Sequence, residues 1–62
     1  MTETEYATAV NLISYFEGRG IILDVRGNRL VAHPARRLKR HDRELIRANW
    51  SSLFEVLRWW RT

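Results

Sequence analysis

The stretch ILDVRGNRLVAH, from Ile22 to His33, alternates apolar and polar residues on both sides of a Gly-Asn pair. Such alternation is typical of strands with one buried face. The Gly27-Asn28 pair can form the tight, primed two-residue turn that joins paired strands. Pro34 follows and ends the second strand, because proline has no backbone N–H to donate. We therefore predict a β-hairpin over about residues 21–33.

The two-residue loop also fixes the register of the hairpin. It pairs Arg26 with Arg29, Val25 with Leu30, Asp24 with Val31 and Leu23 with Ala32. One face is then apolar throughout and carries Ile21, Leu23, Val25, Leu30 and Ala32. This face must pack on helices, because an isolated two-stranded hairpin is at best marginally stable in water. On the other face, Ile22 and Val31 either contact a helix or receive side chains of a partner.

The segment before the hairpin has the spacing of an amphipathic helix, with apolar residues at Tyr6, Ala9, Val10, Ile13 and Phe16. We predict a helix over about residues 5–18. Thr2 and Glu5 fit a capping box at its start, and Thr4 is an alternative cap. Two glycines supply its stop, because a left-handed residue costs little only for glycine: Gly18 and Gly20.

The segment after the hairpin begins with the basic connector PARRLKR. It then returns to helical spacing, at Ile46, Trp50, Leu53, Leu57 and Trp60. We predict a break near Ser51, with Ser52 and Glu55 as a second capping box. This gives helices over about residues 40–50 and 52–60, and one unbroken helix is the alternative.

Length and composition limit what the chain can be. With 62 residues it is one domain, and the elements above give it an α+β fold of order αββα or αββαα over residues 1–62. A domain this small cannot easily enclose a substrate cavity, which takes about 300 Å³ or more. The absence of cysteine excludes disulfides and zinc–thiolate sites and favours the cytoplasm. No stretch reads as a signal peptide or as a membrane span.

Charge is distributed unevenly along the chain, whose net charge is +4 from 11 basic and 7 acidic residues. Basic residues gather between Arg26 and Arg47, which suggests an acidic partner such as a peptide, a nucleic acid or an anionic membrane. A solvated surface without a partner is the alternative. His33 and His41 lie on different elements and make a poor pair of metal ligands, and no activated nucleophile is present. We therefore expect no metal, no cofactor and no enzymatic activity.

Three tryptophans lie close to the C-terminal end of the sequence. Trp50 and Trp60 fall on the apolar helical stripe, so we place them in the core. Trp59 lies beside that stripe. The sequence leaves three alternatives open for Trp59: it is an exposed residue at the end of a helix, it contacts a second copy of the chain in a homodimer, or it packs against a following domain.

These residues resemble the tubulysin-type (TubC-like) N-terminal docking domains of bacterial nonribosomal peptide and hybrid polyketide synthetases. In that family a helix is followed by Gly, Ile or Val, any residue and Leu, then a short turn, Arg-Leu, a strand and a proline. The chain matches this pattern at Leu12, Phe16, Gly20, Ile21, Leu23, Gly27, Arg29, Leu30 and Pro34. Further matches follow at Leu38, Leu45, Ile46, Leu53 and Leu57.

Two positions depart from the family pattern. Lys39 stands where the family usually has a capping Thr, Ser or Asp, so the next helix is expected to start nearer Asp42. Trp50 stands where the family often has a basic residue.

The resemblance implies a non-catalytic adaptor at the N-terminus of one synthetase subunit. Such a domain captures the short, disordered and typically acidic C-terminal tail of the upstream subunit. The tail adds as a strand along the second strand of the hairpin, and charge pairs fix the choice of partner. The partner-binding residues are then expected to be Arg26, Arg29, Leu30, Val31, Ala32, His33, Arg36, Arg37 and Lys39. The resemblance implies no metal and no membrane, and the domain is a monomer or a homodimer.

Strand addition also offers a reason for two like charges at the hairpin tip. Arg26 and Arg29 face each other there, and such a pair repels by roughly a few tenths of a kcal/mol. A carboxylate of the tail between them removes the repulsion and gains charge-assisted hydrogen bonds. Solvated turn residues are the alternative.

Two other functions fit the composition. The charge permits nucleic-acid binding, although no helix-turn-helix spacing is present, so we do not expect it. The second alternative is that the chain is a free-standing small protein that uses the same fold to bind an unknown partner. A condensation-type domain downstream in the gene would favour the synthetase over both.

Overall fold

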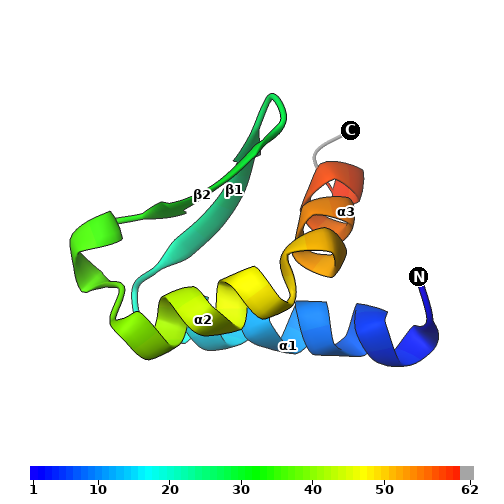
Figure 1. The fold of residues 1–62 in the computed structure, drawn as a ribbon, viewed down its shortest axis with the longest axis horizontal. Coiled ribbons are helices and arrows are strands. Elements are labelled where there is room, and N and C mark those ends of the chain that lie inside the picture. Colours follow the sequence, from blue (N-terminus) through cyan, green and yellow to red (C-terminus); the bar gives the residue numbers. More distant parts are fainter. Residues whose placement is uncertain (61–62) are drawn as a thin grey trace.

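The structure is a computed structural model that describes residues 1–60. Its elements are α1 (Glu3–Gly18), β1 (Ile22–Arg26), β2 (Arg29–His33), the 3₁₀-helix η1 (Ala35–Arg37), α2 (Arg40–Ala48) and α3 (Trp50–Trp60). This is the predicted α+β order αββαα, with one short helical turn added in the basic connector. In Figure 1 the hairpin rises beside α3, and β1 packs against both α1 and α3.

The hairpin has the predicted register. Arg26 pairs with Arg29, Val25 with Leu30, Asp24 with Val31 and Leu23 with Ala32. Gly27 has a φ of 63°, while no other type of residue in the described part of the chain has a positive φ. A positive φ at the first loop position alone is the pattern of the primed turn of type II′. The turn therefore requires glycine at this position.

The predicted capping box begins α1. The Thr2 hydroxyl accepts a hydrogen bond from the N–H of Glu5, and the Glu5 carboxylate accepts one from the N–H of Thr2, both at 3.1 Å. Thr4, the alternative cap, lies inside the helix. The helix therefore starts two residues earlier than predicted, at Glu3.

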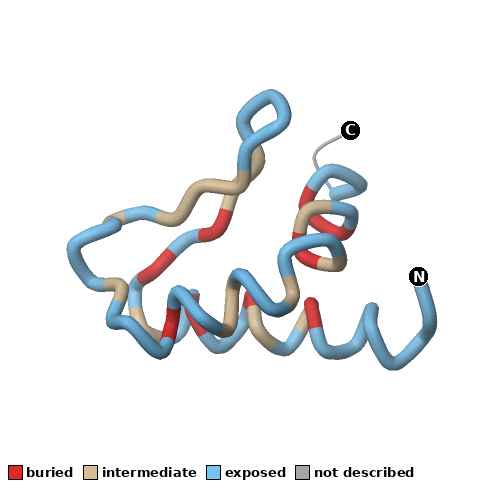
Figure 2. The backbone as a smooth tube through the Cα atoms, viewed as in Figure 1, coloured by how far each residue is buried: buried red, intermediate tan, exposed pale blue. Residues whose placement is uncertain are grey.

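The core lies where α1, β1 and α3 meet. The N–H of Ile21 donates to the carbonyl oxygen of Phe16 at 2.8 Å, so the short connector of residues 19–21 is held to the end of α1 as it leads into β1. The buried apolar residues are Ala9, Ile13, Phe16, Ile21, Leu23, Leu53, Val56 and Leu57. Figure 2 shows buried segments in red on α1, β1 and α3, while β2 has none.

The predicted break between the last two helices is present and lies at Asn49, two residues before Ser51. The backbone N–H of Asn49 caps the end of α2, and its carbonyl oxygen accepts from the N–H of Leu53 at 2.9 Å. One residue thus ends α2 and precedes α3. Ser52 lies inside α3, so the predicted capping box of Ser52 with Glu55 is wrong. Asparagine suits a helix start as well as serine does, so residue type alone could not place the break.

The predicted core positions of Trp50 and Trp60 are also wrong. Their exposed fractions are 42% and 50%, and α3 buries Leu53, Val56 and Leu57 instead. The prediction assumed that one apolar stripe continues from α2 into α3. The turn at Asn49 changes the direction of the chain, so a different side of α3 faces the core. Trp50 stacks on Phe54, with ring centroids 4.9 Å apart and ring planes at 18°.

Asp42 ties the start of α2 to the end of α1. It is 2% exposed, and Arg19 donates to its two carboxylate oxygens at 2.6 and 3.0 Å. The N–H of Lys39 donates to the same carboxylate at 2.9 Å, and α2 begins at Arg40, as the predicted range of about residues 40–50 has it. The later start nearer Asp42, inferred from the departure at Lys39, is wrong. The bonds from Arg19, and then the bond from Lys39, lower the pKa of Asp42 to about 2. The hydrogen bond to Asp42 in turn raises the pKa of Arg19.

Candidate partner-binding groove

The receptive backbone groups of β2 follow from its register. The sheet has two strands, so β2 has one outer edge. In a two-residue hairpin the pair beside the loop is hydrogen-bonded, and bonded and non-bonded pairs then alternate. The N–H and C=O groups of Val31 therefore point to β1, and those of Leu30 and Ala32 point outward. No backbone hydrogen bond from another described segment reaches Leu30 or Ala32.

The outer edge of β1 is less receptive. In the same register the N–H of Val25 points outward, and it donates to Asp24 Oδ1 at 2.8 Å. A charged side chain at a strand edge also discourages the addition of another strand. The sheet therefore offers β2 as its receptive edge.

The outer edge of β2 opens onto a groove of about 560 Å³, which we call the β2–α2 groove. In the view of Figure 1, α2 runs back below β2 in roughly the opposite direction. The apolar part of the lining includes Leu30, Ala32, Leu38, Ile46 and Trp50, and its ionisable part is His33, Arg43 and Arg47. The groove thus combines an apolar surface, a free strand edge and two guanidinium groups.

The two groove arginines differ in their pairing from Arg40, the other arginine of α2, and from Arg19. Arg40 forms an exposed ion pair with Glu44 at 3.6 Å, and Arg19 is paired with Asp42. Neither Arg43 nor Arg47 forms an ion pair with any residue from 1 to 60. Their positive charge is therefore available to a ligand in the groove.

Four of the predicted partner-binding residues line the groove, namely Leu30, Val31, Ala32 and His33. Arg26 and Arg29 do not line it. They lie at the exposed hairpin tip, where they face each other as the register requires. The structure thus separates the predicted set into a strand that borders the groove and a charged pair beyond its end.

The basic connector has other contacts. Arg37 Nη1 lies 3.5 Å from the carbonyl oxygen of Arg19, so this side chain is directed to the end of α1. Lys39 contributes its backbone N–H to the start of α2. Arg36 is exposed on η1. The structure does not bring these three predicted residues, Arg36, Arg37 and Lys39, into the groove lining.

The α2 side of the groove was not predicted. Arg43, Ile46 and Arg47 lie at spacing i, i+3 and i+4, which is one side of α2, and Trp50 follows as the first residue of α3. That spacing was present in the sequence, but Trp50 was predicted to lie in the core, and Ile46 was read only as part of the apolar helical stripe. The position of α2 opposite β2, which brings this side into the groove lining, depends on the tertiary fold.

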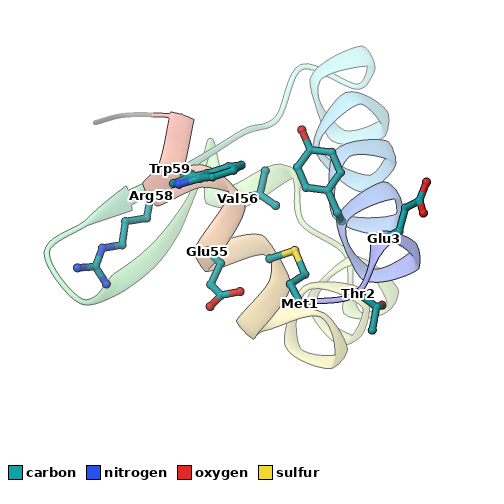
Figure 3. A pocket seen from close by; sticks show the side chains of 8 residues that line it. Met1, Thr2, Glu3, Glu55, Val56, Arg58 and Trp59 are labelled. Carbon is teal, nitrogen blue, oxygen red and sulfur yellow. The ribbon is translucent and has the colours of Figure 1, made fainter.

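A second hollow, of about 690 Å³, lies between the start of α1 and α3. Its lining includes Met1 and Tyr6 from the N-terminal end and Val56 and Trp59 from α3. Figure 3 shows Met1 extending toward α3, where Val56 and Trp59 lie. Trp59 is 75% exposed, so the aromatic surface expected at the end of the last helix is present. This hollow shares no lining residue with the β2–α2 groove.

Metal and membrane sites are not found in the described residues. No group of three His, Asp or Glu side chains between residues 1 and 60 could hold a metal ion. No helix in this range is both long and apolar enough to cross a membrane. In comparisons with known proteins, the chain matches no family model, no curated protein and no solved structure.

Proposed function

We propose that this chain is a non-catalytic docking domain that captures the acidic C-terminal tail of an upstream synthetase subunit. The tail adds to the outer edge of β2 as a third strand and lies in the β2–α2 groove. One observation carries the proposal: the outward backbone groups of Leu30 and Ala32 border a groove that holds two unpaired arginines. Strand addition uses such an edge for affinity and the adjacent side chains for specificity.

The magnitudes suit a weak, reversible contact. Four outward backbone groups on Leu30 and Ala32 form hydrogen bonds that contribute about 0.5–1.5 kcal/mol each. Exposed ion pairs add about 0–1 kcal/mol each, and apolar contacts with Ile46 and Leu38 add to these. Ordering the tail opposes them. The sum fits a micromolar dissociation constant, about −8 kcal/mol.

Arg26 and Arg29 extend the proposed site beyond the groove. They face each other at the hairpin tip, and a carboxylate of the tail placed between them relieves their repulsion. We place the domain in the cytoplasm, as part of a synthetase that performs its chemistry in other domains. The docking step itself uses no cofactor and no metal.

The proposal is tested by an NMR titration of ¹⁵N-labelled protein. The probe is a nine-residue synthetic peptide of alternating glutamate and valine with a free C-terminal carboxylate. We expect the amide signals of Leu30 and Ala32 to shift most and to gain protection from hydrogen exchange. The amide of Val31, which bonds to β1, should change less. Shifts confined to α3, or no shifts at all, contradict the proposal.

Nucleic acid is the other acidic ligand that the charge of the chain permits. Its binding would weaken steeply with salt, because each neutralised phosphate releases a counterion. The same titration with a short DNA duplex, at two salt concentrations, separates the two ligands. The docking proposal is wrong if the DNA duplex binds tightly and with a strong salt dependence while the peptide leaves the amide signals of Leu30 and Ala32 unshifted. Nucleic-acid binding then takes its place.

A further inference from the structure

The spacing of the two groove arginines matches the repeat of an extended peptide. Arg43 and Arg47 are four residues apart on α2, which is about 6 Å along the helix axis. In a strand, side chains on one face recur every two residues, or about 6.6–6.8 Å. A strand added to β2 and directed along α2 therefore places its alternate side chains one opposite each arginine.

Trp50 supplies a third contact at the end of the groove where α3 begins. Its ring is held against Phe54 by stacking and is still 42% exposed. It lines the groove together with Ile46 and Arg47. A fixed aromatic surface of this kind suits a large apolar side chain, because little conformational freedom is lost on contact.

The backbone around the groove favours a peptide over a phosphate chain. The outward groups of Leu30 and Ala32 include carbonyl oxygens, which accept hydrogen bonds from the N–H groups of a peptide. Phosphate oxygens offer these carbonyl groups no donor. The two arginines add positive charge on the other side, so the groove suits a peptide with acidic side chains.

We propose that the groove recognises an alternating motif: two acidic residues separated by one residue, with a large apolar residue two positions further at the Trp50 end. The acidic side chains pair with Arg43 and Arg47, and the apolar side chain contacts Trp50. The intervening residues point to the opposite face of the extended sheet. This inference rests on the proposed function and specifies the sequence of the tail that the domain selects.

The test uses two nine-residue probe peptides built on threonine, with free C-terminal carboxylates. One has glutamate at its third and fifth positions and phenylalanine at its seventh; the other has these residues in the reverse order. Because the tail can run in either direction along β2, we expect one of the two to bind tightest. A control peptide of the same composition, with its two glutamates adjacent, should bind at least tenfold more weakly by fluorescence anisotropy or calorimetry.

Matched variants of the protein assign the contacts. The double substitution R43Q/R47Q should weaken the tighter peptide at least tenfold. The control R40Q/R58Q removes the same charge at two exposed arginines outside the groove lining and should change affinity less than twofold. W50A should abolish the preference for phenylalanine over alanine in the peptide. Circular dichroism verifies that each variant keeps its helices.

The outcomes separate this inference from the function on which it rests. If the peptides shift the Leu30 and Ala32 amides but the adjacent-glutamate control binds equally well, strand addition stands and the alternating motif is wrong. Equal losses of affinity in R43Q/R47Q and R40Q/R58Q also overturn the motif, because they show a general charge effect. If none of the peptides shifts these two amides, the proposed function fails and the motif fails with it.

Discussion

The two strands of the hairpin have the same length and opposite roles. β1 is the held strand: Leu23 is buried with the preceding Ile21, and the strand packs on both α1 and α3. β2 is the open strand: none of its residues is fully buried, and its outward backbone groups border the β2–α2 groove. The comparison shows that one strand of this very small domain anchors the sheet while the outer edge of the other stays open, which is the arrangement that the proposed strand addition requires.

The order of the chain accounts for this difference. A short connector, residues 19–21, joins α1 to β1, and the hydrogen bond from the Ile21 N–H to the Phe16 carbonyl oxygen holds this connector to the end of α1. After β2, by contrast, the chain leaves through η1 before it returns as α2. This detour places α2 across the groove from β2.

The largest expected effect comes from the held strand. Leu23→Ala removes a side chain that is 2% exposed, and such changes cost about 2–5 kcal/mol of unfolding free energy. A domain of this size has a total stability of only about 3–9 kcal/mol, so urea denaturation should show a large loss or an unfolded protein. The matched change Leu30→Ala on β2 concerns a half-buried residue and should cost about 1 kcal/mol. Equal losses at the two positions would remove the distinction between the strands.

A pair of proline substitutions sharpens the comparison within β2 itself. Val31→Pro removes an N–H that points to β1 and should unfold the hairpin, because proline inside a ladder deletes a hydrogen bond. Ala32→Pro removes an outward N–H and should leave the fold largely intact, as proline is tolerated at an open edge. We expect Ala32→Pro to weaken peptide binding about tenfold with little change in melting temperature. An Ala32→Pro protein that binds normally would mean that the tail does not use this edge.

The smallest expected effect is the acid response of the link between α1 and α2. Asp42 has a pKa of about 2 in the folded protein against 3.8 as its ordinary value. A carboxyl group whose pKa is lowered by folding stabilises the folded protein at any pH above its ordinary pKa. For Asp42 this contribution is lost as the pH falls from about 3.8 through about 2. Stability should therefore decline over this range in urea titrations.

Asp42→Asn provides the control for this acid response. Asparagine does not titrate, so the variant should be less stable at neutral pH and should lose less stability on acidification. The pKa of Glu5 is also lowered, by its hydrogen bonds with Thr2, and contributes equally to both proteins. An identical acid response in the wild type and Asp42→Asn would contradict the assigned role of the Arg19–Asp42 pair.

Local signals predicted the parts of the fold that depend on neighbouring residues. Gly27 and the alternation around it gave the turn and the register, and Thr2 with Glu5 gave the start of α1. The same kind of signal failed at Ser52, because Asn49 offers an equally good helix boundary three residues earlier. When two residues are equally good helix boundaries, as Asn49 and Ser52 are, only the packing of the resulting helices decides between them.

The candidate site was predicted on its β2 side and missed on its α2 side. The residues from Leu30 to His33 were predicted from the strand register and the family resemblance, and they line the groove. Arg43 and Arg47 were not predicted, because the sequence does not show which strand a charged residue on a helix will face. The basic connector was predicted to contact the partner, but its residues do not line the groove, and Arg37 points to the end of α1. The sequence could not show this, because it does not say which element a charged side chain will face.

The sequence by itself determined the hairpin, its register, the order of the elements and the excess of positive charge. These features depend on contacts between residues close in the chain, whose geometry is set by backbone preferences. Only the tertiary structure decided which strand is buried, which arginines stay unpaired, and that Asp42 joins Arg19 across 23 positions. Those outcomes depend on how the helices pack, and packing energies are shared among residues that the linear order keeps apart.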